Sequence, residues 1–92
     1  MNSPIYILIF ERYGNREGHH YIGGLYSDLA VATIEGLEHE LYRANKYELR
    51  LEIAYLDSNE ANKEVPREVA INMAKLKFPE RFDDRNQLKE TE

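Results

Sequence analysis

Apolar and polar side chains alternate through most of residues 47–56, with a period of two. The two sets are Tyr47, Leu49, Leu51, Ile53, Tyr55 and Glu48, Arg50, Glu52, Ala54, Leu56. Successive side chains of a β-strand point to opposite faces of the sheet, so this pattern predicts a strand with one face buried and the other largely in water. The fold must therefore contain a sheet, and something apolar must cover one of its faces.

A second strand, apolar on both faces, is predicted at residues 5–10. The run Ile5-Tyr6-Ile7-Leu8-Ile9-Phe10 is too short for a helix and is rich in β-branched and aromatic residues. A strand with two apolar faces is typical of the middle of a sheet. Residues 20–26 are predicted to return beside it, because the intervening glycines and asparagine favour a hairpin loop. Gly23-Gly24 within this returning strand predicts a bulge or the close approach of another group.

Two further segments have the spacing of amphipathic helices. The first begins at Ser27-Asp28, where Ser27 is a suitable N-cap and Asp28 adds negative charge to the first turn. Gly36 inside this helix predicts a tight crossing over a bulky strand residue. The second helix has Pro66 in its first turn and ends near Phe78, because a proline follows. The apolar stripes of the two helices are Ala30, Ile34, Leu37, Leu41, Ala44 and Val65, Val69, Met73, Leu76.

The predicted order of elements is β–β–α–β–α, an α+β arrangement that corresponds to half of a ferredoxin-like fold. A right-handed crossover makes the second and third strands parallel, and the apolar first strand fits between them in a three-stranded sheet of order 2-1-3. Residues 57–64 are interpreted as a polar linker. The 92 residues are enough for one domain. We expect this domain to span residues 1–79 and a frayed, charged tail to span 80–92, anchored by Phe82 and Leu88.

The first helix is expected to cover the apolar face of strand 47–55, which leaves the opposite face of the sheet to be explained. On that face the central strand presents either Ile5, Ile7 and Ile9 or Tyr6, Leu8 and Phe10. The second helix, a second copy of the chain and a binding partner are the three alternatives for its cover.

Composition excludes several classes of protein. A balance of 12 Lys+Arg against 17 Asp+Glu, or −5, argues against a basic nucleic-acid binder. The absence of cysteine rules out a disulfide framework, a zinc ribbon and a cysteine nucleophile, and it fits the cytoplasm of a prokaryotic or phage-infected cell. No apolar run approaches the ~20 residues of a membrane span. The N-terminus also lacks the features of a signal peptide.

The sequence predicts no catalytic, cofactor-binding or metal-binding residue. His19, His20 and His39 do not have the spacing of a metal site. The carboxylates are dispersed, without the pairing that acid–base catalysis needs, and the glycines do not form a phosphate-binding loop. These observations favour a protein without enzymatic activity and leave turnover of a small molecule as the alternative.

Tyrosine is unusually frequent, with seven residues, and tyrosine is enriched in protein interfaces. Three of the seven are expected outside the core, and an arginine flanks one of them at the tip of the hairpin. With three residues of the central strand, the predicted partner-binding set is Tyr13, Arg16, Tyr21, Tyr42, Tyr6, Leu8 and Phe10. A homodimer through the sheet face or a sheet edge is a further expectation.

Residues 5–57 resemble a family of small uncharacterised proteins of bacteria and their phages. The resemblance rests on the strand "YILIFE", the segment "HYIGGLYS" that leads into the first helix, and the alternating strand that ends in "LEIAYLD". It implies a β–β–α–β core and a prokaryotic or phage accessory role. These motifs are structural, so the resemblance assigns no functional residue.

The leading hypothesis is a non-enzymatic protein-binding module, such as a phage or mobile-element accessory protein that inhibits or modulates a host protein machine. The alternative is a small ferredoxin-like dimer that binds or turns over a small molecule between its sheet and its helices. Nucleic-acid binding through the hairpin, where Arg12 and Arg16 flank Tyr13, is the weakest reading, because Glu11 and Glu17 neutralise the two arginines.

Overall fold

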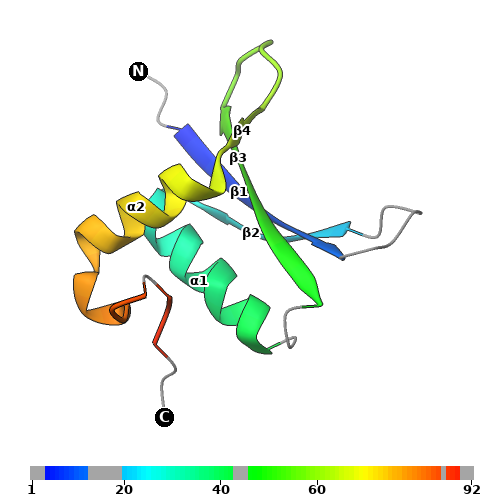
Figure 1. The fold of residues 1–92 in the computed structure, drawn as a ribbon. Coiled ribbons are helices and arrows are strands. Elements are labelled where there is room, and N and C mark those ends of the chain that lie inside the picture. The colour runs from blue at the N-terminus through cyan, green and yellow to red at the C-terminus, as the bar shows by residue number, and fades with distance from the viewer. Residues whose placement is uncertain (1–3, 13–19, 43–45, 86, 90–92) are drawn as a thin grey trace.

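A computed structural model describes residues 4–12, 20–42, 46–85 and 87–89 of the chain. In this part of the chain, two helices lie on one side of a twisted sheet (Figure 1). The elements, in chain order, are β1 (Pro4–Arg12), β2 (His20–Tyr26), α1 (Leu29–Tyr42), β3 (Tyr47–Tyr55), β4 (Lys63–Val65), α2 (Arg67–Lys77) and the 3-10 turn η1 (Pro79–Arg81).

The sheet has four strands in the order β2-β1-β3-β4, and all neighbours are antiparallel. The predicted α+β class and the order 2-1-3 are confirmed, and β2 and β3 run parallel to each other on either side of β1. The prediction of three strands was wrong, because β4 forms within and beyond the segment interpreted as a polar linker. Strand β4 is three residues long and pairs at the edge of the sheet, so it needs no alternating apolar pattern to form.

The register of β1 and β3 separates the side chains of the sheet into two faces. Leu8 pairs with Leu51 and Phe10 with Leu49, and all four side chains are buried. This is the covered face, on which the helices lie. The alternate pairs, Ile7 with Glu52 and Ile9 with Arg50, lie on the other face.

Helix α1 contacts the sheet through small and polar residues. A Cβ on Gly36 would lie 2.9 Å from Leu8 Cδ1 and 3.1 Å from Leu49 Cδ2, which confirms the predicted tight crossing. The ring of His39 packs against Phe10 on the same side of the helix, with the centroids 4.1 Å apart. At about 100° per residue, the predicted stripe around Ile34 and Leu37 lies nearly half a turn from these contacts. The two residues are nevertheless buried, so α1 is covered on a second side as well.

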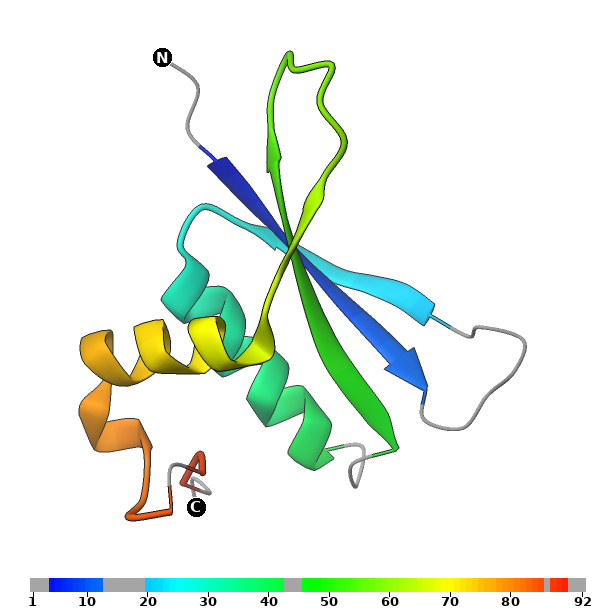
Figure 2. The ribbon, with the colours of Figure 1, turned by 45° about the horizontal axis from the view of Figure 1, so that its top comes forward.

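Helix α2 packs on α1 and not on the opposite face of the sheet (Figures 1 and 2). It buries Ala70 and Ala74 in the same core as the sheet residues. The predicted stripe was wrong for three of its residues, since Val69, Met73 and Leu76 are 45–80% exposed. Small residues replace them in the contact because two helices approach more closely over alanine than over larger side chains. The helix ends before Phe78, as predicted.

The segment after α2 folds back along the helices. Phe82 is buried, and it forms an antiparallel bridge with Leu88, which packs against the core. Arg81 forms an ion pair with Glu38 of α1. The two anchors recognised in the sequence are therefore the residues that attach this segment to the domain.

Asp28, and not Ser27, is the N-cap of α1. Its Oδ1 accepts hydrogen bonds from the backbone N–H groups of Ala30 at 2.8 Å and Val31 at 3.3 Å. The predicted start was one residue too early, because aspartate satisfies the free N–H groups of a first turn as well as serine does. The second carboxylate oxygen of Asp28 forms an ion pair with Lys77 at the end of α2.

Replacing Gly36 with alanine is expected to destabilise the protein by about 1 kcal/mol. Alanine improves helix propensity by about 1 kcal/mol, but overpacking a filled core costs about 1–3 kcal/mol. Urea denaturation of Gly36→Ala measures the balance, with Glu35→Ala on the exposed side of α1 as the control. A Gly36→Ala variant more stable than the wild type would contradict the close contact with Leu8.

Asp28 is expected to make stability depend on pH below about pH 4. The hydrogen bond to Lys77 and then those from the two N–H groups hold the pKa of this carboxyl below its usual 3.8. Its contribution is therefore present at neutral pH and is lost as the pH falls through the lowered value. Asp28→Ala should cost about 1 kcal/mol at pH 7 and clearly less at pH 3. Denaturant titrations at the two pH values test this, and an equal loss at both would refute it.

Candidate functional site

The face of the sheet opposite the helices, here called the open face, is the candidate functional surface. Within the described ranges, no helix, strand or turn packs on it (Figure 2). It consists of an apolar strip over β2 and β1 and a charged cluster over β3, β4 and the end of β1. The strip contains Ile5, Ile7, Ile9, Ile22 and Leu25, and the cluster contains Glu11, Glu48, Arg50, Glu52 and Glu64.

A bulge in β2 creates the exposed part of the apolar strip. The register shifts between Leu8, which pairs with Gly24, and Ile9, which pairs with Ile22, so Gly23 is the extra residue. Residues three apart in a regular strand face opposite sides, but an extra residue reverses the phase. Ile22 and Leu25 therefore both lie on the open face, and each is 65% exposed.

The same bulge is required by the core. A Cβ on Gly23 would lie 2.3 Å from Phe10 Cε2, so only glycine fits beneath this ring. The sequence predicted a bulge or a close approach at this position, and the structure shows both. Shifting the period-two pattern by one residue at the predicted bulge would have identified Ile22 and Leu25 as a pair on one face.

Arg50 holds the charged cluster together across three strands. Its Nη1 donates to Glu11 Oε1 of β1 at 2.5 Å, and its Nη2 donates to Glu52 Oε2 of β3 at 2.6 Å. Its Nε lies 3.2 Å from Glu64 Oε1 of β4. The hydrogen bonds to Glu11 and then to Glu52 raise the pKa of Arg50. One guanidinium group thus forms ion pairs with three carboxylates, which lie on strands that are neighbours only in the folded sheet.

A notch of about 170 Å³ lies beside this cluster, at the edge of β3. Three of the carboxylates line it, those of Glu11, Glu48 and Glu64. Arg50 and Arg67 also line it, and both already form ion pairs with carboxylates. The notch is therefore an acidic recess that adjoins the open face.

Arg67, the first residue of α2, is bound to Glu40 of α1. The two side chains form a pair of hydrogen bonds, Nη1 to Oε2 at 2.7 Å and Nη2 to Oε1 at 2.8 Å. Glu40 Oε2 also accepts the backbone N–H of Leu49 at 2.7 Å. The Glu40 side chain is 9% exposed, so this ion pair is structural. It occupies the outer edge of β3 where β4 has ended.

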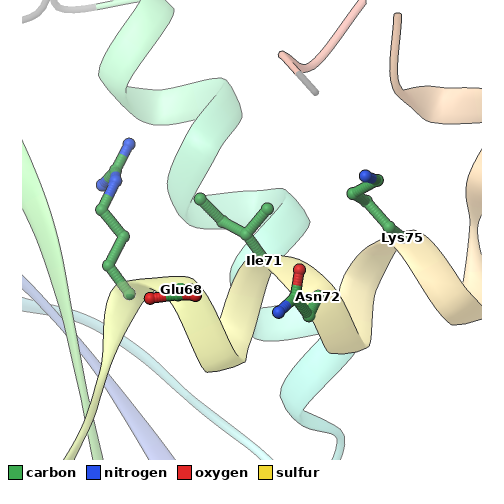
Figure 3. Close-up of a pocket in the computed structure, with 5 residues that line it drawn as sticks. Glu68, Ile71, Asn72 and Lys75 are labelled. Atoms are coloured by element: carbon green, nitrogen blue, oxygen red, sulfur yellow. The ribbon is translucent and has the colours of Figure 1, made fainter. Parts of the chain in front are cut away.

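Helix α2 carries a second depression, of about 520 Å³, which selects no class of ligand (Figure 3). It is lined by Arg67, Glu68, Ile71, Asn72 and Lys75. Charges of both signs and an amide follow one another along the helix, and Arg67 is occupied by Glu40. We therefore treat this depression as ordinary surface.

The predicted partner-binding residues separate into three groups in the structure. Leu8 and Phe10 are 2% exposed and belong to the core, and Tyr6 packs against that core under the helices. The isoleucines that alternate with them are the residues on the open face. Tyr13 and Arg16 lie outside the described residues.

Tyr21 and Tyr42 join an aromatic cluster on the helix side of the sheet. Tyr21 Oη and His39 Nε2 share a hydrogen bond of 2.5 Å, and the rings of His39 and Tyr42 have centroids 6.2 Å apart. Tyr21 also packs against Tyr47, with centroids 5.5 Å apart. The cluster fixes the end of α1 on the sheet, and Tyr42 at its rim is 81% exposed.

Comparisons with protein-family models, curated proteins and solved structures found no match for this chain. Neither helix in the described part is long and apolar enough to cross a membrane. Among the described residues, no three histidine or acidic side chains are arranged to hold a metal ion. The argument about function therefore rests on the open face itself.

Replacing Arg50 with methionine is expected to destabilise the fold by about 1–2 kcal/mol at pH 7. The change removes several partly exposed ion pairs, each worth up to about 1 kcal/mol, and leaves glutamates facing each other across strands. The deficit should shrink as salt is added, because salt screens exposed charges. Denaturant titrations of Arg50→Met and wild type at low and high salt measure it, and a deficit independent of salt would contradict this role of Arg50.

Proposed function

We propose that this protein is a non-enzymatic protein-binding module and that the open face is its docking surface. One observation carries this proposal: Ile22 and Leu25 are each 65% exposed. They lie beside the isoleucines of β1 on a face that no described element covers. Contiguous apolar surface of this kind marks interaction sites. Burial of a large aliphatic side chain contributes about 1.5–3 kcal/mol, so covering the strip would drive association.

The proposed biological role is that of an accessory protein that modulates a host protein machine. The resemblance of residues 5–57 to small bacterial and phage proteins supports this role. A small domain with an exposed apolar strip could act by occupying a site on a larger protein. Such a role needs no catalytic residue.

Binding of a small molecule between sheet and helices has less support. The space between these layers is filled by side chains such as Leu8, Leu51 and Thr33, which are less than 2% exposed. The two depressions described above lie on α2 and at the edge of β3. We therefore favour a surface that docks another protein.

Site-specific photo-crosslinking in bacterial cells tests the proposal. A photoreactive amino acid at position 22 is expected to give an adduct of defined mass with another protein. The matched control carries it at position 76 on α2, where Leu76 is 80% exposed but lies away from the open face. Leu25→Glu in the position-22 protein should abolish the adduct, because a charge on the strip opposes its burial.

Three outcomes would contradict the proposal. One is the same set of adducts from positions 22 and 76, since this would indicate nonspecific contact. Another is an adduct only with a second copy of the chain, which would make the open face a homodimer interface. The third is the absence of any adduct at position 22 while the circular dichroism spectrum shows a folded protein.

A further inference from the structure

We infer that the partner element that docks on the open face is a basic amphipathic helix. Its apolar side chains would cover the strip over β2 and β1, and its lysine or arginine side chains would lie over the carboxylates of β3, β4 and the end of β1. This inference rests on the proposed function and adds the chemistry of the partner.

Charge is distributed unevenly across the open face. The cluster has four carboxylates, those of Glu11, Glu48, Glu52 and Glu64, and one guanidinium, that of Arg50. Three negative charges therefore remain in excess on one side of the apolar strip. The side chains of Glu11 and Glu64 are 45% and 63% exposed, so both can accept further donors. A partner with cations along one flank complements this half of the face.

The notch at the edge of β3 is suited to the end of a lysine or arginine side chain. It has a volume of about 170 Å³ and is lined by Glu11, Glu48 and Glu64. The two arginines that also line it are held by carboxylates, Arg50 by Glu11 and Arg67 by Glu40. The charged lining thus has three carboxylates against two guanidinium groups that are already paired, so its net charge favours a cation.

The width of the face fits one helix. Neighbouring strands are about 4.8 Å apart, so the distance from β2 to β4 is about 14 Å, while a helix with its side chains is about 10–12 Å across. A single helix lying along the strands would contact the apolar strip and still reach the carboxylates. Helices are also the usual cover for the apolar face of a sheet in α+β folds.

A second copy of the chain fits this face poorly. In a face-to-face dimer whose strands are aligned, the two-fold axis would run either across the strands or along them. The first arrangement places the carboxylate clusters of the two copies opposite each other. The second places each cluster over the apolar strip of the other copy, where carboxylates lose water without gaining a cation. Both arrangements bring carboxylates close to other carboxylates or to apolar side chains, whereas a basic helix would place cations over them.

Binding of designed peptides to the full chain tests the inference. The probe is a helical peptide of about 18 residues, which is about 27 Å long, with a leucine stripe and lysines along one flank. The comparison peptide keeps the stripe and has glutamate in place of each lysine. Fluorescence anisotropy at low salt should give at least tenfold tighter binding of the lysine peptide. This advantage should fall as salt is added, because salt screens charges.

Variants test separately how the apolar strip and the acidic cluster contribute to peptide binding. Ile22→Glu should abolish binding of both peptides, and Leu76→Glu on α2 should leave both unchanged. The double variant Glu11→Gln and Glu64→Gln should weaken the lysine peptide severalfold and leave the glutamate peptide equal or tighter. Circular dichroism and the denaturation midpoint of each variant show whether it folds.

The outcomes separate this inference from the proposed function. Equal affinity for the two peptides would overturn the basic helix and leave apolar docking intact. Failure of both peptides to bind would also overturn the helix, while the crosslink at position 22 decides independently whether the face docks a protein. Sedimentation that shows a dimer dispersed by Ile22→Glu would identify a second copy as the occupant and overturn both.

Discussion

The arrangement of the two helices depends on one buried carboxylate, that of Glu40. It accepts the N–H of Leu49 at the outer edge of β3 and two hydrogen bonds from Arg67, the first residue of α2. The end of α1, the edge of the sheet and the start of α2 thus meet at one side chain. Loss of Arg67 would leave the buried carboxylate of Glu40 without its cation, which is unfavourable. This contact joins the start of α2 to α1 on one side of the sheet, and no described element covers the opposite face.

The sequence predicted the elements that alternating or periodic patterns define. The alternation over residues 47–55 located β3, the doubly apolar run located β1 at the centre, and Gly36 correctly indicated a close crossing. Strand β4 was missed because three residues at an edge carry no periodic signal. Glu40 was missed because its burial depends on Arg67, which is 27 positions away. Long-range pairing of this kind leaves no local pattern in a sequence.

The sequence predicted that the sheet has a second face with apolar side chains, but it did not predict what covers this face. Alternation showed that the central strand had apolar side chains on both faces, but it left open which set was free. The structure answers this because Leu8 and Phe10 are buried and Ile22 and Leu25 are exposed. The polar set on β3 was correctly placed together, whereas Glu11 and Glu64 joined Arg50 only through strand pairing. The apolar strip and the acidic cluster therefore form only when the strands pair in this order and register.

The bulge at Gly23 has a consequence for how such a surface can change over time. One extra residue in β2 lets Ile22 and Leu25, which are three positions apart, share the open face. Deletion of the Gly23 codon would make the strand regular, with Ile22 still opposite Ile9 and Leu25 still opposite Ile7. The apolar strip would therefore survive this deletion, whereas a side chain at position 23 would collide with Phe10. Such a surface tolerates loss of the bulge residue better than its substitution, so the strip can persist while the strand changes length.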